Sequence, residues 1–578
     1  MGVFDVAALW TNERKACLFE FFYSNRKTIK GMSVNKSVLQ SNRPAWAATT
    51  EFNDSSIRGS YNPMHFVLRL REDVQQKLST IESGIYTNDI DDEFITSFSV
   101  YLHETIHWWQ HIGSTIGLLL SLAYPAQSHI NNLYLKDIIN EMGPFKSIRT
   151  YSLNQASSTQ TKNEQNLNRI LNNYFDIQFS KSLMFFPLEV SDITKDKFFE
   201  SMGHSYQILW SSVLWLLSSS FDQTNDFLPD PRNWEKSFRR LNDQRVEGFY
   251  WGSPIRLAPM SVREIFEGQA RFSQIQYLYY ASNKSITWEY CETNGLLSDI
   301  YVDAFKYFLE ASESEWPADI GDPLIGLFLL ICDIAINLGD GFPYDLIHHE
   351  SFILSNDPGI RFLILAKHVA KEKSLTSAIK KFSKDEYITV SKELCSALVC
   401  PTPVECALIV KNWAENQTSI QDLLVEESTF KFKNENQPIR VFFSQFIKFQ
   451  TDKCKCPEIF CWPGAHFAGE RCSEETEEIF YKYQALFVAE NNGKIVPRYF
   501  DGKENKHVDE AFNSFYAWNI LYDLSNQWVV EDGPFSYDYS WLTDEYDQER
   551  IKKWAGSLFT NIYGHSPESF IFYNQPSK

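Results

Sequence analysis

The chain has 578 residues and a mass of 67.3 kDa, a length that corresponds to about three or four average domains. Its content of 44% hydrophobic and 22% charged residues is typical of globular proteins and excludes fibrous and low-complexity classes. The formal net charge of −20 predicts repulsion from nucleic acid and from anionic lipid, so we expect neither as a partner.

The apolar runs are too short to cross a bilayer, so we expect no membrane association. The longest cover Ile112–Tyr124, Ile208–Leu217 and Pro323–Leu338, whereas a spanning helix needs about 20 apolar residues, and the last run contains Asp333. No secretion signal is recognisable at the N-terminus. The ten cysteines follow no disulfide framework, which favours reduced thiols and a cytoplasmic location.

Helical periodicity dominates the chain, so the expected fold is mainly α with a small β component (α+β). The first expected element is a strand over His65–Leu70. A long helix follows from Asp91, because large apolar residues recur at three- and four-residue spacing from Phe94 to Trp109. Polar residues 147–167 predict a loop, and an aromatic helical stretch follows it.

A second strong helix is expected over Ser261–Tyr280, where Ser261 and Glu264 form a capping box. From residue 296 to about 440 the apolar pattern is again mainly helical. Another helix is expected over Glu474–Glu490, after a cluster of cysteines.

The motif with the clearest chemistry is His103-Glu104-Thr105-Ile106-His107. On a helix, residues four apart share one face, so His103 and His107 can present two imidazole nitrogens to one zinc ion. Glu104 would then lie beside the metal-bound water, where its carboxylate can act as general base. Zinc supplies the complementary chemistry, because it lowers the pKa of bound water and polarises a carbonyl group.

This motif resembles that of the zincin metallopeptidases, which take a third metal ligand from further along the chain. One subgroup uses a later histidine, but His111 lies about 80° around the helix from His103 and is expected to pack as a neighbour. In the gluzincin subgroup the ligand is a glutamate on a second helix, followed three residues later by alanine. Glu267 and Ala270 match that pattern, whereas Glu264 is better explained by the capping box.

The resemblance implies a zinc ion held by His103, His107 and Glu267 with water as the fourth ligand. Two departures from the gluzincin pattern are visible: 160 residues separate His107 from Glu267, and Arg271 replaces the aspartate that follows the alanine. The residue that stabilises the transition state is left open among His204, Tyr250, Arg271 and Tyr277, which can all donate a hydrogen bond.

A second zinc site is a separate hypothesis. Cys454, Cys456, Cys461 and Cys472 lie within 19 residues and could hold a structural zinc, with His466 between them. The alternative is a loop of free thiols. Three other cysteines lie among apolar residues and are expected in the core: Cys395, Cys400 and Cys406.

Four regions are expected along the chain. Residues 1–90 form an N-terminal mixed region with an edge strand, and 91–295 form a zincin-like metallopeptidase core. Residues 296–440 form a helical domain, and 441–578 form a C-terminal region with the cysteine cluster. The edge strand at His65–Leu70 would align a substrate backbone by strand addition.

The sequence therefore predicts a cytoplasmic zinc metallopeptidase that hydrolyses peptide bonds of a peptide or protein substrate, with Glu104 as its base. A regulatory protein partner is a further expectation. Two alternatives remain open: a zinc hydrolase of a non-peptide amide or ester, and a regulatory or binding protein with a non-catalytic zinc site.

Overall fold

The computed structural model describes residues 58–62, 66–79, 92–154, 161–187, 190–298, 300–490, 494–539 and 548–573. Most of the predicted N-terminal region and part of the predicted loop at 147–167 lie outside these residues. The strands are β1 (Gly59–Asn62), β2 (Val67–Leu70), β3 (Phe145–Lys146), β4 (Phe487–Ala489), β5 (Ile495–Pro497) and β6 (Ile571–Phe572).

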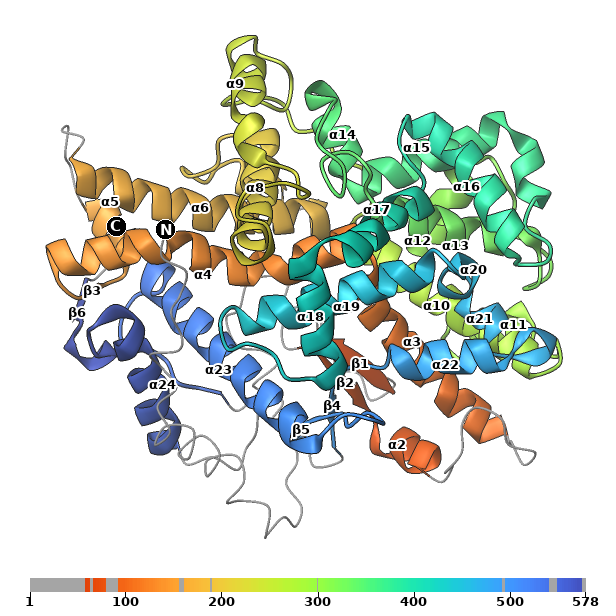
Figure 1. Cartoon of the computed structure of the whole chain (residues 1–578). Helices are drawn as coiled ribbons and strands as arrows, with labels where there is room; N and C mark the ends of the chain where they lie inside the picture. The colour runs from red at the N-terminus through yellow and green to blue at the C-terminus, as the bar shows by residue number, and fades with distance from the viewer. Residues whose placement is uncertain are drawn as a thin grey trace.

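The α-helices of the first half are α2 (Glu72–Ser79), α3 (Asp92–Gly113), α4 (Thr115–Met142), α5 (Ile148–Asn154), α6 (Lys162–Phe185), α7 (Val190–Ile193), α8 (Met202–Phe221), α9 (Glu235–Asp243), α10 (Val262–Ala281), α11 (Trp288–Thr293) and α12 (Ile300–Ala311). Those of the second half are α13 (Pro323–Ile336), α14 (Phe352–Asn356), α15 (Pro358–Lys371), α16 (Lys384–Leu398), α17 (Pro403–Asn416), α18 (Thr418–Thr429), α19 (Gln437–Lys453), α20 (Pro457–Cys461), α21 (Pro463–His466), α22 (Glu474–Lys482), α23 (Asn505–Val530) and α24 (Gln548–Tyr563). The fold is mainly α with a small β component, as the sequence predicts (Figure 1).

The larger sheet has four short strands in the order β1-β2-β4-β5. Strand β2 pairs antiparallel with β1, where Gly59 lies opposite Leu70, and parallel with β4, where Val67 lies opposite Phe487. The strand predicted at His65–Leu70 is β2, but the prediction that it is an edge strand is wrong because it has a partner on both sides. Among the described strands, β1 and β5 form the edges of this sheet.

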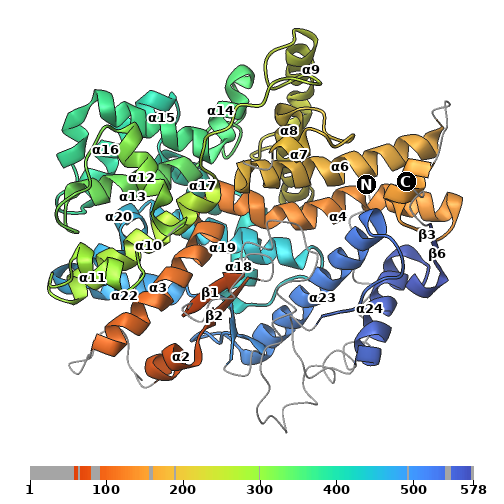
Figure 2. The ribbon, with the colours of Figure 1, turned by 180° about the vertical axis from the view of Figure 1, so that it is seen from behind.

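Helices α3 and α10 pack directly against each other and lie in the same half of the molecule, on the right in Figure 1 and on the left in Figure 2. Helix α3 is buried along most of its length, which agrees with its predicted apolar face. Helix α10 begins at Ser261, whose side chain accepts a hydrogen bond from the first turn while Glu264 bonds back to the Ser261 amide. The predicted capping box is therefore confirmed.

One continuous cluster of buried side chains extends from Tyr61 to Phe570. Helix α10 packs not only on α3 but also on α12, α13 and α21, which come from later parts of the chain. The long helices α4 and α6 lie side by side and continue the same helical layer (Figure 2). The regions predicted at 91–295, 296–440 and 441–578 thus contribute to a shared core.

Among the described helices, none is by itself long and apolar enough to cross a membrane. Helices α16 and α17 meet the length and composition criteria only together, and the chain bends by 100° between them.

Candidate metal centre

His103 and His107 lie one turn apart on α3 and direct their Nε2 atoms to the same point. The two Nε2 atoms are 3.2 Å apart. His103 is 5% exposed and the His107 side chain is 12% exposed, so both rings are held by surrounding side chains. The helical spacing of the motif therefore produces the convergence of imidazoles that the sequence predicts.

Glu267 reaches the same point from α10. Its Oε2 atom lies 3.6 Å from His103 Nε2 and 3.4 Å from His107 Nε2. Ligand atoms about 2.0–2.2 Å from a tetrahedral zinc lie about 3.3–3.6 Å from one another, so the three side chains fit a zinc ion without rearrangement. Within the described part of the chain, no other group of three or more His, Cys, Asp or Glu side chains converges in this way.

Gln110 holds the two helices in register at the site. Its Oε1 atom lies 2.8 Å from His107 Nδ1, and its amide nitrogen donates to the carbonyl of Phe266 and to the side chain of Gln269, both at 2.9 Å. Metal-binding histidines commonly donate their second ring nitrogen to such an acceptor, which fixes the ring orientation. Gln110 is not among the site residues predicted from the sequence, although its position three residues after His107 places it on the same helix face.

The second imidazole lacks an equivalent partner. His103 Nδ1 is buried and has no hydrogen-bond partner among the described residues. One imidazole nitrogen of the candidate site is therefore without an acceptor among the described residues.

The buried titratable groups of the site strongly shift one another's pKa values. Burial lowers the pKa of His103 to about 3, so that imidazole is neutral. Burial also disfavours the charged form of His107, but the Glu267 carboxylate outweighs it and raises the pKa of His107 to about 9. Burial opposes the ionisation of Glu267 as well, yet His107 and His103 hold its pKa well below the usual range. The carboxylate is consequently available as an anionic ligand.

Glu104 lies beside this group and is 5% exposed. Burial raises its pKa to about 8, and Glu267 adds to that rise while His107 and Arg271 oppose it. Strand β1 passes directly over it: a Cβ atom at Gly59 would lie 2.8 Å from Glu104 Cγ and 2.9 Å from Oε1. Glycine is therefore required where the strand meets the carboxylate.

Of the four candidates for transition-state stabilisation, only Arg271 lies at the site. Its guanidinium lies 3.9 Å from the ring centre of Tyr301, and the Tyr301 ring in turn meets the edge of His103 at 5.8 Å. Tyr301 begins the neighbouring helix α12 and was not a sequence candidate, because nothing in the sequence links it to the motif. Burial raises the pKa of Tyr301, and Glu267 and Glu104 add to the effect.

The other three candidates lie elsewhere. His204 Nε2 is 3.4 Å from Asp176 Oδ2, Tyr250 stacks with Arg245, and Tyr277 packs against Phe98.

Two remaining sequence interpretations concern His111 and the cysteine cluster. His111 packs between the rings of Tyr61 and Phe266 and takes no part in the metal centre, as expected.

The four clustered cysteines do not converge, and they form no metal-binding group within the described residues. Cys456 precedes α20 and Cys461 ends it, and both are buried. Cys472 contacts Thr476, and His466 bonds to the carbonyl of Phe382. The structure brings no set of ligands together for the structural zinc.

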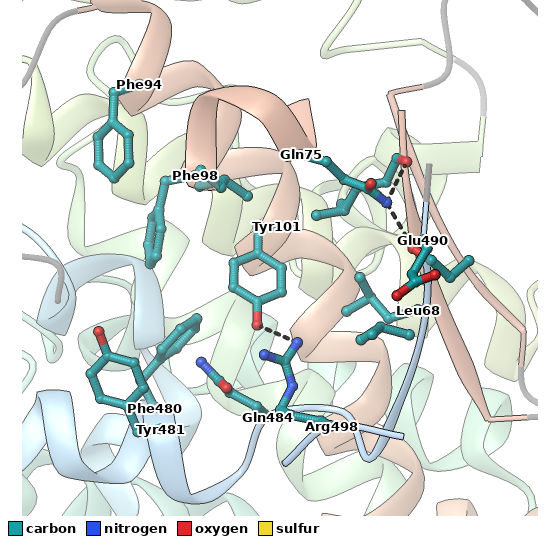
Figure 3. A pocket seen from close by; sticks show the side chains of 14 residues that line it. Leu68, Gln75, Phe94, Phe98, Tyr101, Phe480, Tyr481, Gln484, Glu490 and Arg498 are labelled. Atoms are coloured by element: carbon teal, nitrogen blue, oxygen red, sulfur yellow. Dashed lines mark hydrogen bonds between the residues drawn. The ribbon is translucent and has the colours of Figure 1, made fainter. Parts of the chain in front are cut away.

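A cavity of about 440 Å³ lies on the far side of α3 from the metal centre (Figure 3). Helix α3 contributes Phe94, Phe98 and Tyr101, which are roughly 140–180° around the helix from His103. Arg498 donates a hydrogen bond to the Tyr101 hydroxyl at 3.1 Å inside it. None of the three candidate metal ligands lines this cavity, so it is separate from the site described above.

The arrangement of two imidazoles and a carboxylate on packed helices defines a candidate metal centre. The chain matches no protein-family model, no curated protein and no solved structure. The resemblance to zincins therefore depends on the residues of the site alone.

Proposed function

We propose that this protein is a zinc-dependent hydrolase that cleaves peptide bonds of a peptide or protein. The observation that carries the proposal is the convergence of His103, His107 and Glu267 to mutual distances of 3.2–3.6 Å beside the buried Glu104. A structural zinc site needs four protein ligands, whereas the described residues supply three, which leaves a coordination position for water or substrate.

In this proposal, each residue of the site has a separate role. His103, His107 and Glu267 hold the ion, and Gln110 orients the His107 ring. A bound zinc ion lowers the pKa of water and polarises a carbonyl group. The positive charge of a bound zinc ion would favour the ionised form of Glu104 against the effect of burial. As a carboxylate, Glu104 accepts the proton of the attacking water and passes it to the leaving amine.

Arg271 and Tyr301 are the donors that suit the developing oxyanion. Tyr301 on α12 lies against the His103 ring, and the guanidinium of Arg271 on α10 lies over the Tyr301 ring. Arg271 donates from Nη1 to Gln274 Oε1 at 2.7 Å, and its Nε has no hydrogen-bond partner among the described residues. A guanidinium close to the site stabilises negative charge that forms on the carbonyl oxygen.

The experiment compares the wild type with Glu104→Gln and Glu267→Ala. Glu104→Gln should retain one zinc per chain and lose about 10²–10⁴ in rate, because only the proton transfer is removed. Glu267→Ala should lose zinc itself. Zinc is measured by atomic emission, and cleavage by mass spectrometry on a panel of peptides, amides and esters.

The panel also separates the alternatives. Cleavage of amides or esters without peptide cleavage would favour the non-peptide hydrolase. Full zinc content in Glu267→Ala, or undiminished activity in Glu104→Gln, would refute the proposed mechanism.

A further inference from the structure

A pair of thiols lies at the bend between α16 and α17. The amide of Cys400 donates to the carbonyl of Cys395 at 3.3 Å, because Val399 ends α16 in the left-handed conformation and turns the chain back. This backbone bond places Cys395 next to Cys400, and Cys395 is the largest single influence on the pKa of the Cys400 thiol. Cys400 is half-buried, so its thiol is the outer one and is reachable from solvent. Cys395 is buried, so its thiol is the inner one of the pair.

A buried arginine points at the outer thiol. Arg361 on α15 is 1% exposed, and its Nη1 and Nη2 atoms lie 4.0 and 3.9 Å from Cys400 Sγ. Its other hydrogen bonds all go to backbone carbonyls, those of Ile334, Ala335, Asn337 and Ser355. Within the described chain, no carboxylate forms an ion pair with it.

This geometry favours a negative charge on Cys400. A guanidinium is always charged in proteins, and burying it without a counterion is costly. The carbonyls at the end of α13 supply only the partial charge of a helix C-terminus. The Cys400 sulfur is the group in direct contact that can carry a full negative charge.

The other titratable groups around Cys400 agree with this assignment. The neighbouring Cys395 thiol lowers the pKa of Cys400; burial opposes that shift, Arg361 adds to it, and Asp340 acts in the opposite direction. Cys406 on α17 faces the same space, but burial raises its pKa to about 12 and its thiol donates to the Leu338 carbonyl.

We propose that Cys400 is a reactive thiolate at which soft electrophiles and peroxides modify this protein, and that Cys395 is its resolving thiol. The proposal is independent of the function proposed for the metal centre. A peroxide is the oxidant: the Cys400 thiolate attacks one peroxide oxygen, the O–O bond breaks, and hydroxide leaves as the sulfur becomes a sulfenic acid. Cys395 then attacks that sulfur, an S–S bond forms, and the S–O bond breaks with release of water.

The first test measures alkylation of the native full chain by iodoacetamide between pH 5 and 9, with peptide mass spectrometry for each cysteine. The rate at Cys400 should reach half its maximum at a pH well below the ordinary value of a cysteine thiol, which is about 8.5. Cys454 is also half-buried but has no guanidinium in hydrogen-bonding contact among the described residues, and burial raises its pKa, so it serves as the internal control with a higher midpoint. A midpoint for Cys400 equal to that of Cys454 would overturn the proposal.

The second test adds one equivalent of hydrogen peroxide and maps the products. The wild type should lose two hydrogens across the Cys395 and Cys400 peptides, whereas Cys395→Ser should stop at a sulfenic acid that dimedone traps on Cys400. Cys406→Ser is the matched control and should still form the disulfide. Trapping of sulfenic acid on the wild type without disulfide formation would refute the resolving role of Cys395.

Discussion

At the residue scale, the polar contacts behind the ligands decide how well the site can hold a metal. Gln110 is the clearest case, because one side chain orients His107 and bonds to two groups on α10. His103 has no such support at Nδ1. Of the two imidazole rings, only that of His107 is therefore oriented by a hydrogen bond at Nδ1 among the described residues.

Gln110→Ala should consequently weaken zinc binding by about 10–100-fold, the usual effect of losing a hydrogen-bond partner of a ligand. Removal of the amide leaves His107 free to rotate and also deletes two bonds between the helices. Zinc affinity is measured by competition with a chelator of known affinity, and folding by circular dichroism.

Gln269→Ala is the matched control, since it removes only a bond to Gln110 and keeps the Gln110 oxygen at His107. It should change zinc affinity much less. Equal losses in the two variants would show that helix packing, and not orientation of the imidazole, sets the affinity.

The convergence of His103 and His107 could be predicted from the sequence because their four-residue spacing fixes a shared helix face. Glu267 was predicted only from the resemblance of its helix to the gluzincin pattern, and the structure places it beside both imidazoles. Tyr301 and Gly59 could not be predicted in this way. They reach the site through packing of α12 and β1, and no short-range pattern reports that proximity.

At the element scale, α13 shows how an apolar helix can contain a charged residue. It is buried from Leu324 to Ile336, and Asp333 on it accepts a hydrogen bond from Lys453 of α19 at 2.7 Å. The Tyr387 hydroxyl and the Asn337 amide complete its hydrogen bonds at 2.6 and 3.0 Å. These three partners come from three different parts of the chain. The sequence therefore shows that the apolar helix contains a charged residue, but it does not show which groups neutralise and hydrogen-bond that residue.

Lys453→Met should lower the free energy of unfolding by about 3–5 kcal/mol, because it leaves the Asp333 carboxylate buried without its cation. The change is measured by urea denaturation. The double variant Lys453→Met with Asp333→Asn removes the uncompensated charge and should recover part of that loss.

The control is Lys455→Met, which breaks an ion pair with Asp452 at the surface, where the lysine side chain is 63% exposed. This substitution should lower the free energy of unfolding by less than about 1 kcal/mol. A Lys453→Met variant as stable as this control would contradict the buried ion pair.

At the scale of the whole molecule, the candidate metal centre depends on segments far beyond the region that contains His103, His107 and Glu267. Trp109 of α3 donates to the Tyr483 carbonyl at 2.8 Å, and Phe272 of α10 packs on Phe305 and Phe328. At Gly464, α21 crosses α10 so closely that a Cβ atom would lie 2.1 Å from the Ser273 carbonyl oxygen. Boundaries drawn from composition cannot anticipate these contacts.

A fragment of residues 91–295 contains His103, Glu104, His107 and Glu267, yet we expect it neither to fold cooperatively nor to bind zinc stoichiometrically. In the fragment, several large apolar side chains along α3 and α10 become exposed together. For each of them the fragment loses the roughly 1.5–3 kcal/mol that burial contributes to the free energy of folding. Circular dichroism during urea unfolding and zinc content after gel filtration are compared with the full chain. A fragment that unfolds in one sharp transition with one zinc per chain would establish region 91–295 as an independent domain, and the shared core would then be only an interface between domains.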